Sequence, residues 1–296
     1  MISVLLSLSP SDARKLRHPN ARPTLGPTEV NSQGNLIDTH CHLDDPKLAA
    51  HLPAVLHRAQ QAGVIGMVAI GCAKSLGNLD SALDVARRHP DQVRATTGIH
   101  PHDAEHQSDA LFDALEELAR DPLIVAIGET GLDFFYEYAS RAAQRESLRR
   151  NIAIAKRVDK PLIIHTRDAA SETLEVLKEE HARDVGGIIH CFSEDAHFAK
   201  ASLDLGFVAS FSGIVTFKNA SEVREAARKQ PEDAILVETD APYLAPVPKR
   251  GSINEPSFVG YTAAMIAELR GQTTEELHAI TTQNARRVLN LSFESL

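Results

Sequence analysis

Short apolar runs rich in β-branched residues alternate with longer amphipathic segments from residue 36 almost to the end of the chain. This alternation predicts strands that are joined by helices, and therefore a parallel sheet. The expected strands cover residues 36–43, 64–72, 93–101, 123–133, 161–168, 186–193, 207–215 and 235–243. Because eight such units favour a closed barrel over an open doubly wound sheet, the pattern predicts an α/β fold, a TIM (β/α)8 barrel.

The segments between these runs have helical periodicity. Residues 140–158 place apolar positions on one stripe and Arg and Glu outside it; the stripe is formed by Ala143, Leu148, Ile152 and Ala155. After the last strand we expect a Pro-rich loop over 241–256 and helices near 259–269 and 274–289. Helical segments thus separate all the predicted strands.

We expect one catalytic domain over residues 36–296, preceded by a flexible extension over 1–35. Pro, Ser, Gly and Asn interrupt the first 35 residues, and this composition is typical of a tail without a packed core. A barrel of this type commonly takes about 250 residues, which fits the remaining chain. We assign the extension no catalytic role.

Composition narrows the class of protein. No run approaches the roughly 18 to 20 apolar residues that a membrane-spanning helix needs, so we expect a soluble protein. Three cysteines, Cys41, Cys72 and Cys191, have no paired spacing, which favours a reducing compartment and makes the cytoplasm the default. The net charge of −9 gives no basic surface for nucleic acid, so a polyanionic substrate would need local positive charge such as metal ions.

Candidate chemistry is concentrated at the strand ends. In residues 38–42, strict alternation places Asp38, His40 and His42 on one face and Thr39 and Cys41 on the other. At the fourth strand, Glu129 ends an apolar run, where an unpaired charge is costly unless a cation meets it. The fifth and sixth strands end in histidine and the eighth in two carboxylates; these residues are His165, His190, Glu238 and Asp240.

The carboxyl ends of all strands of a TIM barrel meet at one rim. A single histidine there is more often a hydrogen-bonded core residue than a ligand, but six candidate ligands would converge; they are His40, His42, Glu129, His165, His190 and Asp240. Four imidazoles and two carboxylates suffice for two divalent ions if Glu129 bridges them. We therefore expect a two-metal site.

The order of these residues resembles the TatD family of metal-dependent deoxyribonucleases within the amidohydrolase-like superfamily. The resemblance runs from Leu36 to about Leu291, and its motifs are residues 38–43, 98–102, 128–133, 161–167, 190–193 and 238–244. It departs from the family pattern at Thr130, Thr166 and Glu194, none of which is a ligand candidate. The resemblance implies that His40, His42, Glu129 and Asp240 hold one metal and that Glu129, His165 and His190 hold the other. It also implies exonucleolytic cleavage of DNA in the 3′–5′ direction.

We hypothesise that a water activated by the two ions attacks phosphorus, with Glu129 bridging the ions and Asp240 also accepting the water proton. Arg167 should bind phosphate as a forked donor. His100 and His102 are expected substrate contacts or proton donors. Phe134, Phe135 and Tyr136 directly follow the Glu129 strand and are expected to stack on a base, which suits sequence-tolerant binding of a single strand, although core packing under the loop explains at least one of them equally well. Further substrate contacts are expected at Arg250 and Asn254, and a solvated loop is the alternative for Arg250.

Other reactions use such a site. A binuclear centre does not itself choose phosphorus, so hydrolysis of a small-molecule amide, lactone or ester, or of an aminoacyl ester on tRNA, stays an alternative. A noncatalytic metal-binding protein is a third. The expected ions are Mg²⁺, Mn²⁺ or Zn²⁺; the imidazoles favour a transition metal, with Mg²⁺ sufficing in an assay. We expect DNA as the partner and no membrane.

Overall fold

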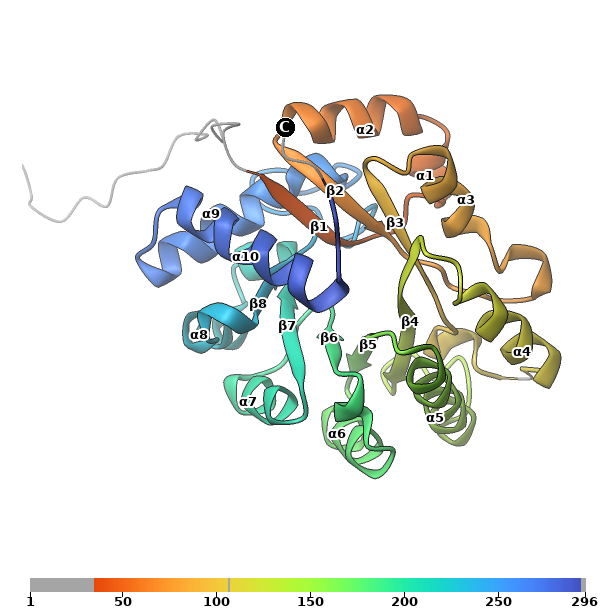
Figure 1. The fold of residues 1–296 in the computed structure, drawn as a ribbon. Helices are drawn as coiled ribbons and strands as arrows, with labels where there is room; N and C mark the ends of the chain where they lie inside the picture. The colour runs from red at the N-terminus through yellow and green to blue at the C-terminus, as the bar shows by residue number, and fades with distance from the viewer. Residues whose placement is uncertain (1–34, 106, 294–296) are drawn as a thin grey trace, which may run out of the picture.

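The computed structural model describes residues 35–105 and 107–293. Its eight strands form one sheet in which every neighbouring pair is parallel and the spatial order follows the sequence. Figure 1 shows the strands at the centre and the helices around them. The strands are β1 (Leu36–Cys41), β2 (Val64–Ala69), β3 (Val93–Thr97), β4 (Ile124–Asp133), β5 (Leu162–Arg167), β6 (Gly187–Ile189), β7 (Phe207–Phe211) and β8 (Ile235–Val237).

Backbone hydrogen bonds join the last strand region to the first. The Asp240 N–H donates to the His40 carbonyl at 2.9 Å, and the His42 N–H donates to the Ala241 carbonyl at 2.7 Å. An isolated parallel bridge between Cys41 and Ala241 lies at the same place. The sheet thus closes on itself, and the predicted (β/α)8 barrel is confirmed.

The helices follow the predicted rhythm. The α-helices are α1 (Pro46–Ala49), α2 (Leu52–Gln61), α3 (Ser81–Arg88), α4 (Asp109–Leu118), α5 (Arg141–Val158), α6 (Ala170–Glu179), α7 (Ala196–Asp204), α8 (Ser221–Lys229), α9 (Val259–Arg270) and α10 (Thr274–Leu289). Short 3-10 turns are η1 (Leu76–Asn78), η2 (Pro101–Asp103), η3 (Ala182–Asp184), η4 (Gly213–Thr216), η5 (Glu232–Ala234) and η6 (Pro256–Phe258). Ser140 caps α5 by accepting from the Ala143 N–H, so the predicted helix begins one residue later. No described helix has the length and apolarity to cross a membrane.

Most strands are shorter than predicted at their carboxyl ends. β6 ends at Ile189, before His190, and β8 ends at Val237, before Glu238. Cys191 and Asp240 have φ values of 44° and 57°, a left-handed conformation that no strand continues. In β6 and β8 the chain therefore leaves the ladder where the polar residues begin, whereas β1, β4 and β5 carry their polar site residues within the strand.

The two faces of the strands belong to different cores. Strand residues such as Ile163, Ile188 and Leu236 pack in one cluster, while their chain neighbours pack in a second cluster with the outer helices. Alternation with a period of two explains this division. The first cluster fills the barrel interior, and the second lies between the sheet and its surrounding helices.

β1 departs from the strict alternation that the sequence analysis assumed. Its pairing with β2 shifts register between Asp38 and Cys41. Thr39 Oγ1 lies 2.9 Å from Ser210 Oγ of β7, whereas Cys41 packs among the helix-facing residues. The prediction that Thr39 and Cys41 share a face is therefore wrong, because the irregularity changes the side to which successive residues turn.

The amino end of the barrel is closed by α10 and the chain after it. Ala285, Leu289, Leu291 and Phe293 pack against the interior strand residues. A Cβ at Gly66 would collide with the Phe293 ring, so this close approach requires glycine. We call these four residues with their strand neighbours the floor. The prediction of a flexible extension over 1–35 concerns residues outside those that the structure describes, apart from Asn35.

Candidate metal centre

Glu129 lies at the centre of the mouth, on β4, and is only 2% exposed. Its Oε1 lies 2.8 Å from His190 Nε2, 2.9 Å from His165 Nδ1 and 3.3 Å from His100 Nε2. Its Oε2 lies 3.4 Å from His40 Nε2 and 3.9 Å from that of His42. The two oxygens of one carboxylate therefore face two different groups of imidazoles.

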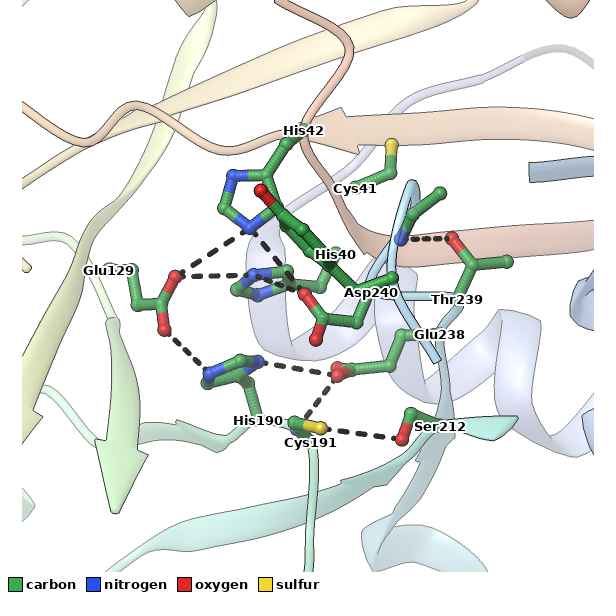
Figure 2. A network of polar contacts seen from close by, with 12 residues as sticks. His40, Cys41, His42, Glu129, His190, Cys191, Ser212, Glu238, Thr239 and Asp240 are labelled. Carbon is green, nitrogen blue, oxygen red and sulfur yellow. Dashed lines mark hydrogen bonds and ion pairs between the residues drawn. The ribbon is translucent and has the colours of Figure 1, made fainter. Parts of the chain in front are cut away.

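Asp240 faces the same space from the turn after β8, as Figure 2 shows. Its Oδ1 lies 3.5 Å from His42 Nε2 and 3.7 Å from His40 Nε2. Three groups of side chains place one ligand atom each within 4.8 Å of one another; they are His40, His42 and Glu129, then His40, His190 and Asp240, and finally His100, Glu129 and His165. The structure thus brings together all six ligand candidates and adds His100.

The donor set fits divalent metal ions. Both ring nitrogens of His40 are buried without a hydrogen-bond partner among the described residues. The His40 ring stacks on that of His190, with centroids 3.9 Å apart and planes 11° from parallel. Buried polar atoms of this kind are costly unless something satisfies them. A cation bound by His40 Nε2 and the facing Glu129 carboxylate would satisfy that nitrogen, and nitrogen with oxygen ligands suits zinc, manganese or iron.

Burial and mutual charge shift the ionisation of these groups. Burial opposes the charge of Glu129, but His190 and His100 hold its pKa well below the usual range. Burial lowers the pKa of His40, while Glu129 and Glu238 raise that of His190 well above normal despite burial. Without a cation, protons on imidazole balance the carboxylates. Metal binding would therefore compete with protons at this site.

Asp133, at the end of β4, links several parts of the site. Its Oδ2 lies 3.1 Å from His165 Nε2 and 2.9 Å from His102 Nε2. Its Oδ1 accepts from the backbone N–H groups of Phe135 and Tyr136, each at 3.0 Å. Burial opposes its charge, yet His165, the Tyr136 N–H and His102 lower its pKa. Asp133 orients the His165 ring and fixes the start of the β4–α5 loop.

Two further carboxylates support the β6 and β8 ends. Glu238 Oε1 lies 3.3 Å from His190 Nδ1 and accepts from the Cys191 N–H at 2.7 Å (Figure 2). Asp38 accepts from the Thr239 N–H at 2.9 Å and from its hydroxyl at 2.5 Å. Burial raises the pKa of Asp38 to about 7. Asp38 therefore braces the turn before Asp240 instead of joining the ligand candidates.

The structure places three of the predicted substrate contacts at or beside the mouth and three others outside the ligand cluster. Arg167 is half-buried beside the mouth, with its guanidinium carbon 3.9 Å from the centre of the Phe135 ring. No residue in 35–105 or 107–293 forms a hydrogen bond or ion pair with that guanidinium. His100 and His102 lie in the site, as the distances to Glu129 and Asp133 establish.

The remaining three lie outside the ligand cluster. Phe134 is 8% exposed and packs beneath the Arg141 guanidinium at 4.3 Å. Asn254 is fully buried; its amide nitrogen donates to the Thr239 carbonyl at 2.8 Å, and its oxygen accepts from the Glu255 N–H. Neither residue therefore belongs to the substrate site that we propose.

Arg250 donates to the Ala245 carbonyl at 3.2 Å and lies 4.0 Å from the centre of the Phe217 ring. It is exposed on the loop after β8, and these contacts hold it to that loop.

Sequence reasoning assigned no role to Asp133, Glu238 or Cys72. A signal existed for Asp133, because it follows Glu129 by four residues on one strand and alternation places both on one face. Glu238 was recognised as a strand-end carboxylate, but nothing in the sequence pairs it with His190. Cys72 Sγ lies 3.9 Å from Glu129 Oε2, and burial raises the pKa of its thiol to about 11. That proximity depends on the barrel and has no sequence signal.

Comparisons with known proteins agree with this geometry. The chain is 42% identical over 264 residues to the uncharacterized metal-dependent hydrolase YcfH of Escherichia coli K12, with 88% of this chain and 98% of the relative covered. It is 33% identical over 262 residues to the 3′-5′ ssDNA/RNA exonuclease TatD of Edwardsiella piscicida, covering 87% of this chain and all of the relative.

The fold comparison gives the same result. The crystal structure of the TatD homolog YJJV from Escherichia coli K12 matches with a TM-score of 0.81 and 30% identity, over 87% of this chain and 98% of the other. The family model for TatD related DNase matches residues 37–290. Fold, strand-end residues and relatives agree, and the chain belongs to the TatD family of metal-dependent hydrolases.

Proposed function

We propose that this hydrolase cleaves phosphodiester bonds of DNA as a 3′–5′ exodeoxyribonuclease. The observation that carries the proposal is the Glu129 carboxylate, whose two oxygens face separate imidazole groups, beside an Arg167 guanidinium that stacks on aromatic rings but has no hydrogen-bond acceptor among the described residues. A bridging carboxylate suits a pair of cations, and a guanidinium whose N–H groups lack an acceptor suits a phosphate. The relative named as a 3′-5′ ssDNA/RNA exonuclease supports the choice of bond.

The residues divide between two divalent ions. His40, His42, Glu129 and Asp240 would hold one, and Glu129, His165 and His190 the other; His100 lies near enough to Glu129 and His165 to join the second group. When bound, such ions polarise the phosphodiester and lower the pKa of water. Glu238 and Asp133 would orient the rings of His190 and His165.

Asp240 is the proposed general base. Its side chain is 14% exposed, which makes it more accessible from the mouth than Glu129. Burial opposes its charge, but His42 and His40 lower its pKa, so it is ionised at neutral pH. An ionised carboxylate at the mouth can accept a proton from the attacking water.

Arg167 and the histidines of η2 are the proposed substrate contacts. The Arg167 N–H groups are directed to no described acceptor and can bind two phosphate oxygens. His100 and His102 flank Pro101 on the same side of the mouth, where an imidazole that holds no metal ion, such as that of His102, can protonate the leaving oxygen. These local groups compensate for the net charge of −9, which opposes binding of DNA elsewhere on the surface.

A nuclease assay tests this function. Protein loaded with Mg²⁺, Mn²⁺ or Zn²⁺ should shorten 5′-labelled single-stranded DNA one nucleotide at a time from its 3′ end, and EDTA should abolish cleavage. Arg167→Ala should raise KM about tenfold, whereas Arg120→Ala, which removes an exposed arginine of the outer surface, should leave it unchanged.

A parallel panel of lactones, amides and aminoacyl-tRNA addresses the other reactions of such sites. Turnover of one of these, together with intact DNA under every metal condition, would refute the proposed bond. Metal analysis of protein purified without added ions addresses the cofactor, and we expect a transition metal near two equivalents per chain.

A further inference from the structure

Exposed aromatic side chains gather around the mouth of the barrel. Among the residues that the structure describes, the exposed aromatics are Phe135, Tyr136, Tyr138 and Tyr243, with 46% to 67% of their surface accessible. The chain has only four tyrosines, and three of them belong to this group. Their exposure contributes little to packing, and exposed apolar groups that cluster in this way mark binding surfaces.

Phe135, Tyr136 and Tyr138 form a patch on the β4–α5 loop, which we call the aromatic platform. The rings of Tyr136 and Tyr138 lie 4° from parallel, with centroids 5.4 Å apart. Phe135 packs edge to face with Tyr136 at 4.9 Å. The three rings support one another while keeping about half or more of their surface accessible.

The platform is held at a fixed position relative to the metal centre. One oxygen of Asp133 accepts from the N–H groups of Phe135 and Tyr136, and the other contacts His165. His102 shares that second oxygen and places its ring 4.8 Å from Tyr138. A group stacked on the platform therefore lies beside the reacting centre.

Arg167 extends the platform with positive charge. Its guanidinium lies over Phe135 at 3.9 Å and over Tyr136 at 4.7 Å. Stacking fixes the plane of the guanidinium, and its N–H edges have no acceptor among the described residues. The surface thus offers flat apolar rings and a forked phosphate donor side by side.

We propose that the aromatic platform binds the base of an unpaired nucleotide adjacent to the phosphodiester held by Arg167. Such stacking does not depend on the base sequence, since every base has a face that can stack. Inside a duplex those faces are covered by neighbouring base pairs. This inference rests on the proposed function and adds to it the feature by which the strand is selected.

The test compares two 5′-labelled single-stranded oligonucleotides that differ only at the 3′-terminal residue, which is either a normal nucleotide or an abasic one. The wild-type holoenzyme should cleave the normal probe with a kcat/KM about tenfold higher. In Tyr136→Ala/Tyr138→Ala this preference should disappear, because both probes should be cleaved at the rate of the abasic one. In Tyr136→Phe/Tyr138→Phe it should persist.

Leu76→Ala is the matched control, since Leu76 is an equally exposed apolar residue on the β2–α3 connection. It should keep the preference. If the alanine pair retains the preference, or the wild type has none, the platform proposal is overturned.

Binding of the same two probes with terminal phosphorothioate linkages, measured by fluorescence anisotropy, separates the two proposals. Tighter binding of the normal probe that depends on the tyrosines, without cleavage of natural DNA, supports the platform and refutes the proposed nuclease activity. Equal or absent binding of both probes refutes the platform.

Discussion

The mouth and the floor of the barrel are formed by the same strands, but the mouth contains buried polar and charged side chains and the floor contains apolar ones. At the mouth, Glu129 is a buried carboxylate, and His40 has buried ring nitrogens without a hydrogen-bond partner among the described residues. Burying such groups reduces the free energy of unfolding unless a cation compensates for them. At the floor, Leu289 and Phe293 cover the interior with apolar surface. Stability and chemistry are thus separated along the barrel axis, as is general for TIM barrels. Variants at each end should therefore change different measured quantities.

The largest effect is expected from Glu129→Gln. The amide keeps the shape but cannot supply the charge that both imidazole groups face. We expect hydrolysis to fall by at least about a thousandfold, or about 4 kcal/mol in activation free energy. Activity and bound metal are measured together, and Glu117→Gln, an exposed change on α4, is the control. If the Glu129 variant kept its activity, the charge of this carboxylate would not be needed for hydrolysis.

A core truncation at the floor comes next. Leu289→Ala removes a side chain that is 1% exposed and should reduce the free energy of unfolding by about 3 kcal/mol. Chemical denaturation measures this loss, with Ile253→Ala on an exposed loop as control. The folded variant should keep its metal content and kcat. A large fall in kcat would show that the two ends are coupled.

An intermediate effect is expected from the carboxylate behind His190. Glu238→Gln keeps an acceptor for the Cys191 N–H but weakens the contact with His190 Nδ1. Metal affinity should fall about tenfold, as titration calorimetry would show. Asp133→Asn should likewise weaken the contact with His165 Nε2 and reduce the metal affinity by a similar factor. An unchanged affinity in both variants would mean that these carboxylates do not orient ligands.

The smallest effect concerns pH at the floor end. Burial lowers the pKa of His278 on α10, and neither ring nitrogen has a hydrogen-bond partner among the described residues. The neutral form is therefore favoured in the folded state, and its contribution to stability is full above the unfolded pKa of about 6.5 and is lost as pH falls below it. In His278→Asn, the decrease in Tm between pH 7.5 and pH 5.5 should be smaller by a degree or two. An identical decrease would exclude this histidine as a cause.

The sequence predicted the strands well because β-branched runs and helical stripes depend on local periodicity. It predicted His40, His42, Glu129, His165, His190 and Asp240 as neighbours because one topological rule places all strand ends together. What it could not give were contacts that depend on backbone turns. The left-handed residues Cys191 and Asp240 change the direction of the chain, and the register shift in β1 separates Thr39 from Cys41.

Substrate contacts were harder to predict than ligands for a related reason. Phe134 and Asn254 occur beside site motifs, but a residue type does not reveal whether its side chain turns inward. Asn254 has its amide occupied by backbone groups, and Phe134 lies under Arg141. Phe135 and Tyr136 of the same predicted run follow Phe134 directly and are exposed, so one position along the loop separates a packing residue from a surface one.

Both ends of the described chain lie at the floor. Asn35 precedes β1 and accepts a hydrogen bond from Thr282 of α10, and Phe293 packs beside Gly66 at the start of β2. Figure 1 shows the carboxyl-terminal segment crossing toward β1 and β2. A tether to a bead, a sensor chip or a fused fluorescent protein, attached at Asn35 or Phe293, would therefore hold the molecule with its mouth directed into solution. Single-molecule force measurements on a strand being shortened could use this orientation without re-engineering the barrel.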